Sequence, residues 1–178
     1  MQKQVKTIFI SFIALLILVA TYYFNPHAIQ ITTNTADTPA TTIRPTFVLP
    51  DLEGQTHNVS EWDGKVIMVN FWATWCPPCR SEMPAFNKLY SNYKEQGFVI
   101  IGIAIDSSDS VQNFVDLMDI QYPILTSEDN GIRLAKAYGN ELGALPFTAI
   151  IDQNGHIIQT HRGELSYEEA EAIITPLL

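Results

Sequence analysis

The feature that most constrains this fold is a nearly continuous apolar run, KVIMVNFWAT, at residues 65–74. A strand that is buried on both faces of a sheet has this composition. Residues 77–96 then place apolar side chains on one helical face, and Gly97 is suited to the end of that helix. A second continuously apolar stretch, FVIIGIAID, follows at residues 98–106. The segment therefore predicts a strand–helix–strand unit with two parallel strands and a right-handed crossover.

Shorter patterns predict the elements on either side of this unit. Before it, residues 46–65 predict a β-hairpin with a turn at Glu53–Gly54. After it, we expect a helix over 107–121, a short strand over 122–126, a short helix over 131–139, a hairpin over 147–163 and a final helix over 166–178. These elements indicate an α/β domain.

Local signals predict how some of these elements begin and turn. The helix after the strand–helix–strand unit should have its N-cap near Asp109 or Ser110. The last hairpin turns at Asn154–Gly155, a pair that favours a type I′ turn. Ser166 and Glu169 form a capping box at the start of the final helix.

The charge and the cysteine count exclude several classes of function. Ten Lys and Arg residues against nineteen Asp and Glu residues give a net charge of −9, which argues against binding to nucleic acids. Two cysteines are too few for a disulfide scaffold, and none of the four histidines has metal-motif spacing with them. We therefore expect neither a cofactor nor a metal site.

The N-terminus predicts the compartment. Residues 8–24, IFISFIALLILVATYYF, carry no charge, and as a helix they would span about 25 Å, near the lower limit for crossing a bilayer. Lys3 and Lys6 precede the run and belong on the cytoplasmic side by the positive-inside rule. We expect residues 1–24 to be an uncleaved signal anchor of a single-pass cell-membrane protein, with a cleaved signal peptide as the alternative. Under either interpretation the domain lies on the extracytoplasmic side.

The segment that follows predicts a tether. Residues 25–43 are polar and rich in threonine and show little periodicity, so we interpret them as a flexible linker with a reach of about 20–25 Å. The folded domain is expected over residues 44–178. Because disulfides persist in oxidising compartments, the two cysteines would work where other proteins hold disulfides.

Both cysteines, Cys76 and Cys79, lie in the motif WCPPC where the apolar strand gives way to the helix. A helix N-terminus favours the thiolate, so we expect a lowered pKa for the Cys76 thiol. One helical turn separates the two sulfurs, which allows a disulfide. A bridge that closes so short a loop adds little stability, which argues against a purely structural role. The motif predicts thiol–disulfide exchange, in which Cys76 attacks a substrate disulfide and Cys79 releases the substrate from the mixed disulfide.

The neighbours of the cysteines are candidates for substrate contact. Pro77 suits the first helical position, and together with Pro78 it stiffens the loop that holds both redox states. Trp75 is adjacent to the attacking cysteine, so we expect it on the substrate-binding surface. Trp72 fits either that surface or the core.

These residues resemble a known family. The stretch NFWATWCPPCRSEMP, the segment FTAIIDQNGHI and the order of the elements resemble the thioredoxin superfamily, specifically the membrane-anchored TlpA-like and ResA-like extracytoplasmic thiol–disulfide oxidoreductases. The resemblance covers residues 44–178. It implies a thioredoxin fold with a central mixed sheet flanked by helices, an N-terminal β-hairpin and a helix–strand insert over residues 107–126. Peroxiredoxins share this core but need Thr or Ser three residues before the attacking cysteine, where this chain has Ala73. We therefore do not expect peroxide reduction.

The resemblance also implies roles for residues outside the CPPC motif. The family's cis-proline, which faces the cysteines, corresponds to Pro146, and its geometry would leave the main chain of Leu145 free to pair with a substrate strand. Asn70 stands where thioredoxins carry a buried aspartate, so that proton acceptor is absent. In the ResA-like branch a glutamate three residues after the second cysteine acts as a proton acceptor near this position. The resemblance therefore assigns Glu82 as the proton acceptor for Cys79. An ordinary exposed position on the helix is the alternative for Glu82.

The function implied by the resemblance is that of a membrane-tethered protein-disulfide reductase that acts on exported proteins. A substrate would be an apocytochrome c, whose CxxCH motif must be reduced before haem attachment. A transmembrane thiol carrier would supply the electrons. Two alternatives stay open: an oxidant or isomerase of exported proteins, and a binding module that uses the thioredoxin groove without turnover.

Overall fold

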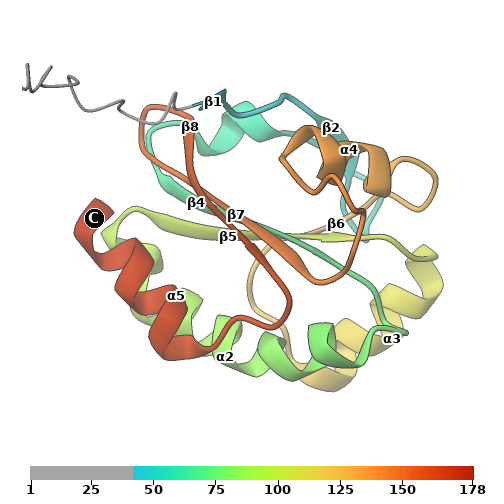
Figure 1. Ribbon diagram of the computed structural model, residues 1–178. Helices are drawn as coiled ribbons and strands as arrows, with labels where there is room; N and C mark the ends of the chain where they lie inside the picture. Colours follow the sequence, from blue (N-terminus) through green and yellow to red (C-terminus); the bar gives the residue numbers. More distant parts are fainter. Residues whose placement is uncertain (1–41) are drawn as a thin grey trace, which may run out of the picture. The chain divides into compact units, whose positions relative to one another are not determined.

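The computed structural model describes residues 42–178 (Figure 1). The predicted anchor at residues 1–24 and the predicted tether up to residue 41 lie outside the described residues. Among the helices of residues 42–178, none is long and apolar enough to cross a membrane. Thr42–Ile43 form strand β1 and pair with a C-terminal strand, so the sheet begins two residues before the predicted start of the domain.

A six-stranded mixed sheet lies at the centre of the domain, in the order β1-β8-β7-β4-β5-β6 (Figure 1). The strands after β1 are β4 (Val66–Trp72), β5 (Phe98–Ala104), β6 (Ile124–Thr126), β7 (Phe147–Ile151) and β8 (His156–Arg162). β4, β5 and β6 run parallel, whereas β7 is antiparallel to β4, and β8 to β7. Every residue of β4 and β5 is buried, which explains why their sequences are apolar without alternation.

Helices cover both faces of this sheet (Figure 1). The α-helices are α2 (Pro77–Tyr93), α3 (Ser108–Met118), α4 (Gly131–Ala137) and α5 (Tyr167–Ile174), and the short 3₁₀ helices are η1 (Val59–Trp62), η2 (Lys94–Gln96) and η3 (Thr175–Leu177). Alternate residues of β4 face opposite sides, as a pleated strand requires. Met68 packs in a core layer with residues of α2, α3 and α5, and Val69 packs in a second layer with residues of η1 and α4. The predicted α/β class and mixed sheet are confirmed.

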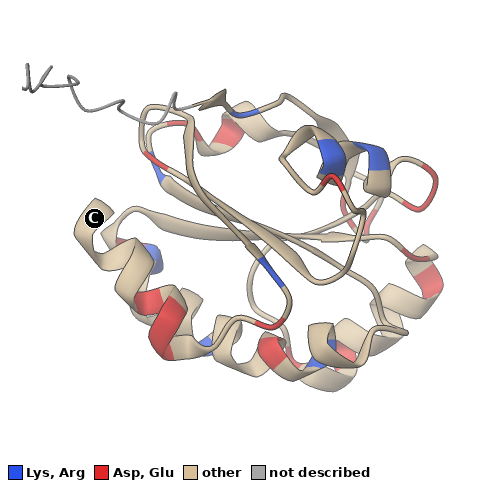
Figure 2. Cartoon of the chain, viewed as in Figure 1, with Lys and Arg blue, Asp and Glu red and all other residues tan. Residues whose placement is uncertain are grey.

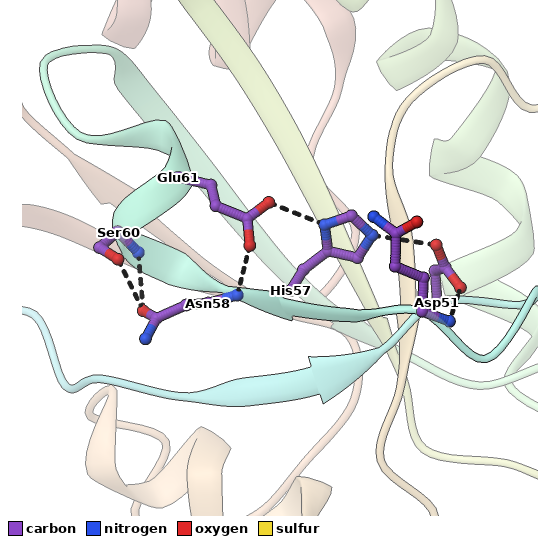
Figure 3. A network of polar contacts seen from close by, with 6 residues as sticks. Asp51, His57, Asn58, Ser60 and Glu61 are labelled. Atoms are coloured by element: carbon purple, nitrogen blue, oxygen red, sulfur yellow. Dashed lines mark hydrogen bonds and ion pairs between the residues drawn. The ribbon is translucent and has the colours of Figure 1, made fainter.

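The predicted N-terminal hairpin consists of β2 (Val48–Pro50) and β3 (Thr56–Asn58). The side chain of His57 stabilises this hairpin through two hydrogen bonds (Figure 3). Its Nδ1 lies 2.8 Å from Glu61 Oε2, and its Nε2 lies 2.9 Å from Asp51 Oδ2. The hydrogen bonds with Glu61 and Asp51 raise the pKa of His57, and the bond with His57 lowers the pKa of each carboxylate. A main-chain bridge from Asp51 to Leu125 of β6 joins the hairpin to the edge of the central sheet.

Two local predictions were wrong. The N-cap of α3 is Ser107, two or three residues before the predicted positions. The turn between β7 and β8 is not type I′, because that type needs positive φ at both central residues and only Gly155 has it, at 82°. The physical reason is Asp152, whose carboxylate accepts the N–H groups of Asn154 and His156 and so holds a longer loop. The capping box of Ser166 at the start of α5 is confirmed.

Charged residues occur on the helices and loops on both sides of the sheet (Figure 2). Acidic segments occur on α5 and near η1, which lie on opposite sides of the sheet in the described domain. The acidic residues of the described domain are therefore not confined to one side of the sheet (Figure 2).

Candidate active site

The two cysteines lie where the central strand β4 ends. β4 ends at Trp72, and a tight turn follows, closed by a 3.2 Å hydrogen bond from the Cys76 N–H to the Ala73 carbonyl. Cys76 is the N-cap of α2, and Pro77 and Pro78 occupy the first two helical positions, as the sequence predicts for Pro77. The strand therefore delivers Cys76 to the N-terminal end of a seventeen-residue helix.

Cys76 and Cys79 form a disulfide, with their Cα atoms 5.3 Å apart. Cys76 is 4% exposed and Cys79 is fully buried, so an incoming group reaches Cys76 first. A helix start leaves four N–H groups without intrahelical partners. At the start of α2 these four positions are Cys76, Pro77, Pro78 and Cys79. The two prolines have no N–H, and the Cys76 N–H donates to the Ala73 carbonyl. The N–H of Cys79 is therefore the remaining donor of the first helical turn.

Glu82 lies on α2, one turn after Cys79, and is buried, with 1% of its surface exposed. Its spacing of three residues from Cys79 puts both side chains on the same face of α2. Its Oε1 accepts a hydrogen bond from Asn70 Nδ2 at 2.8 Å, and its Oε2 accepts one from the Leu165 N–H at 3.0 Å. Burial raises the pKa of Glu82 to about 8, against the lowering effect of these two hydrogen bonds. The alternative of an exposed helix glutamate is therefore wrong.

The loop before β7 supplies the predicted proline. The Leu145–Pro146 peptide bond is cis, as the resemblance implied, and Pro146 is buried. The antiparallel register pairs Phe147 with Phe71, which sets Pro146 beside the last residue of β4. The cis-proline loop and the WCPPC turn therefore lie at the same end of the sheet.

The two tryptophans separate into different environments. Trp72 is fully buried and its ring packs 5.5 Å from the ring of Phe114 in α3, so it belongs to the core. Trp75 is 66% exposed at the tip of the turn, directly before Cys76. This large apolar surface next to the reactive sulfur suits contact with a substrate.

Sequence reasoning missed part of the environment of Glu82. Thr148 Oγ1 accepts a hydrogen bond from Asn70 Nδ2 at 3.1 Å, and the main chain at Leu165 holds the other side of the carboxylate. Thr148 could have been noticed as the one polar residue in the strand FTAII. No sequence signal marks Leu165, because it contributes a main-chain group.

Comparison with known proteins places this geometry in a family. The family model described as Redoxin matches residues 38–174. The chain belongs to the redoxin family. Thiol-disulfide oxidoreductase ResA of Bacillus thuringiensis subsp. konkukian (strain 97-27) is 41% identical to this redoxin over 128 residues, 71% of this chain and 72% of the relative.

Longer alignments and solved structures agree. Thiol-disulfide oxidoreductase ResA of Geobacillus kaustophilus (strain HTA426) is 36% identical over 172 residues, 96% of this chain and 95% of that protein. The crystal structure of a thioredoxin-family thiol:disulfide interchange protein from Chlorobium tepidum TLS matches with a TM-score of 0.71 and 29% identity, covering 77% of this chain and 96% of that one. This redoxin is thus a ResA-like member of the thioredoxin superfamily.

The predicted activity class is confirmed. The redoxin is an enzyme of protein-disulfide reduction, working by thiol–disulfide exchange through its CPPC motif. The predicted helix–strand insert corresponds to α3 and β6, with β6 extending the sheet beside β5.

Proposed function

We propose that this redoxin reduces disulfides in exported proteins, with Cys76 as the attacking thiolate, Cys79 as the resolving thiol and Glu82 as the proton acceptor. The observation that carries the proposal is the arrangement of these three groups along the start of α2. Cys76 lies outermost at the N-cap, and Cys79 and Glu82 are buried on one helical face. An outer thiolate and an inner thiol with a neighbouring base suit the two steps of disulfide reduction.

In the first step the Cys76 thiolate attacks one sulfur of the substrate disulfide. The substrate S–S bond breaks, a mixed disulfide forms, and the second substrate sulfur leaves and takes up a proton. In the second step Cys79 gives its proton to Glu82 and attacks the sulfur of Cys76. The bond between the Cys76 sulfur and the substrate sulfur breaks, and that substrate sulfur leaves as a thiolate and takes up a proton. The substrate is released as a dithiol with two more electrons, and the enzyme ends with its own disulfide.

The basicity of Glu82 supports its role. An ordinary glutamate, with a pKa near 4.5, is a poor acceptor for a thiol proton, whereas a pKa of about 8 comes close to that of a thiol. At pH 7 about a tenth of the Glu82 carboxyls are ionised at such a pKa, so the second step should accelerate as the pH rises toward 8.

The substrate-binding groove is proposed to lie between the WCPPC turn and the cis-proline loop. Trp75, Pro77 and Pro78 form one side of it. The main chain of Leu145, next to Pro146, would pair with an extended segment of the substrate, because strand addition supplies affinity without demanding a particular sequence.

The proposal extends to the location and the partners of the enzyme. We propose that residues 1–24 anchor the enzyme in the cell membrane with the domain on the extracytoplasmic side, on the basis of the apolar run and the preceding lysines. A transmembrane thiol carrier would then reduce the Cys76–Cys79 disulfide after each turnover. Apocytochrome c is the proposed substrate, because its CxxCH cysteines must be reduced to take up haem.

The first test is the reduction potential of the Cys76–Cys79 pair, measured by equilibration with glutathione or dithiothreitol buffers. A value near or below that of thioredoxin, about −270 mV, would support a reductant. A value near about −120 mV, as for strong exported oxidants, would favour the oxidant or isomerase instead.

The second test separates an enzyme from a binding module. In the Cys79→Ala variant an enzyme should accumulate mixed disulfides through Cys76, visible as adducts on non-reducing gels that disappear with dithiothreitol. Cys76→Ala is the matched control and should trap far less. A binding module would hold its partners equally well in both variants and without a covalent bond.

The substrate is tested in a deletion strain. Loss of covalently attached haem from c-type cytochromes, restored by the wild-type gene and not by the Cys79→Ala gene, is the expected result. Normal cytochrome c levels in the deletion strain would exclude apocytochrome c as the main substrate and leave other exported proteins as candidates.

A further inference from the structure

The turn that presents Cys76 is held by a residue that follows the neighbouring strand β5. The turn runs from Ala73 to Cys76, with Thr74 as its first central residue. The closing hydrogen bond uses the N–H of Cys76 and leaves the N–H of Thr74 without a partner inside the turn. Asp106, just beyond the end of β5, accepts both that N–H, at 3.2 Å, and the Thr74 hydroxyl, with the single oxygen Oδ2.

The same carboxylate also holds the start of the insert helix. Asp106 Oδ1 accepts the N–H of Ser107, the N-cap of α3, at 2.8 Å. Beside it, the Ile105 N–H donates to the Trp72 carbonyl at 2.8 Å, which continues the pairing of β4 and β5 to the base of the turn. Both oxygens of Asp106 are therefore used, and they tie three segments together: the turn before Cys76, the end of β5 and the beginning of α3.

The turn has little other support at its tip. Trp75, which follows Thr74, is 66% exposed and so contributes little packing, while Ala73 at the other side of the turn is buried. Hydrogen bonds to a charged acceptor are about twice as strong as neutral ones, so Asp106 is the main constraint on the orientation of Thr74. Displacement of a reacting atom by about 1 Å can cost a large factor in rate.

We propose that Asp106 is a positioning residue for disulfide exchange: through Thr74 it fixes the turn that aims the Cys76 sulfur at the substrate disulfide. The inference rests on the proposed role of Cys76 as the attacking thiolate. It makes Thr74 and Asp106 one functional pair, joined across 32 residues of sequence. It also gives the insert helix α3 a direct attachment to the active site.

The test compares two reactions of the reduced full-length protein. One is exchange with a peptide that contains a disulfide, which needs an aligned sulfur. The other is alkylation of Cys76 by iodoacetamide across the pH range, which reports ionisation of the thiol and depends less on alignment. Thr74→Val keeps the shape of the side chain and all charges but loses the hydroxyl. It should slow exchange about tenfold, equivalent to about 1.4 kcal/mol, and leave the midpoint of the alkylation profile unchanged.

Matched variants sharpen the result. Thr74→Ser keeps the hydroxyl and should restore the exchange rate, and Thr160→Val, the same substitution at an exposed position of β8, should have no effect. Asp106→Asn should also slow exchange, because it removes the charge from the acceptor of the Thr74 N–H and hydroxyl. The double variant should be slowed by less than the product of the two single effects, because the two residues share the hydroxyl contact. If Thr74→Val does not fold, as judged by its thermal melting, Asp106→Asn and Thr74→Ser carry the comparison.

Three results would overturn the inference. The first is an unchanged exchange rate in Thr74→Val and Asp106→Asn, and the second is an exchange rate of Thr74→Ser as low as that of Thr74→Val. The third is a shifted alkylation midpoint in Thr74→Val, which would mean that the pair changes the ionisation of the Cys76 thiol. Failure of the proposed function looks different. In that case mass spectrometry would show no preferential alkylation of Cys76 over Cys79, in the wild-type protein and in the variants at position 74 alike.

Discussion

Replacement of Glu82 by Gln should remove a large dependence of stability on pH. The pKa of Glu82 is raised from 4.5 in the unfolded chain to about 8 in the folded protein, chiefly by burial. Between these values the folded protein keeps the proton and the unfolded chain releases it, so the free energy of unfolding falls as the pH rises. A difference of about 3.5 pH units, each worth 1.36 kcal/mol, corresponds to about 5 kcal/mol.

The assay is urea unfolding of the oxidised protein at intervals between about pH 4.5 and about pH 9, for the wild type and Glu82→Gln. The disulfide keeps both cysteines from titrating, and groups such as His57 titrate equally in both proteins, so their contributions cancel in the difference. Gln cannot ionise, so the stability of the variant relative to the wild type should increase by about 5 kcal/mol across this range.

Parallel curves for the two proteins would refute the reasoning. They would mean that Glu82 titrates with the same pKa in the folded and unfolded states, and that burial is offset in full by the hydrogen bonds from Asn70 and Leu165. Such a carboxylate would be ionised at neutral pH and too weak a base for the Cys79 proton.

Three further predictions concern the rest of the domain. The charged contacts of His57 stabilise the fold fully below about pH 6.5, and this stabilisation is lost as the pH rises through the raised pKa of the folded protein. The loss of unfolding free energy in His57→Ala, measured with urea, should therefore become smaller from about pH 5.5 to about pH 9. A loss that stays constant with pH would contradict this. Gly131→Ala places a Cβ 2.6 Å from Ile105 Cγ1 and should cost about 1–3 kcal/mol in urea unfolding, whereas a stability gain would show that Ile105 moves freely. Ser166→Ala removes the side-chain cap of α5 and should lower the free energy of unfolding by about 1 kcal/mol, measured by thermal melting. An unchanged melting temperature would contradict this and would mean that water replaces the hydroxyl.

The sequence predicted the elements of the domain well because their signals are local. Continuous burial of β4 and β5 produced apolar runs that could not be mistaken for amphipathic helices. The i, i+3 spacing of Cys76 and Cys79 already placed both sulfurs on one turn of a helix. The wrong turn type at Asn154 arose from a competing local contact, because the preceding Asp152 binds the main chain ahead of it.

The environment of the cysteines could not be predicted from local sequence patterns. The resemblance pointed to Glu82, but whether it lay in the core or on the surface depended on Asn70 and Leu165, which are 12 and 83 residues away. Likewise Thr74 and Asp106 carry no motif of their own, and their contact exists because β4 and β5 end side by side.

The sequence by itself therefore determined the class of chemistry: a helix N-terminus with two cysteines one turn apart permits disulfide exchange wherever it folds. Only the tertiary structure decided how that chemistry is tuned. A carboxyl pKa is raised when the surrounding fold removes water from it. The orientation of a reactive turn depends on the distant segment that supplies its hydrogen-bond acceptor. Both effects depend on groups that the folded sheet, and not the order of residues along the chain, brings into contact.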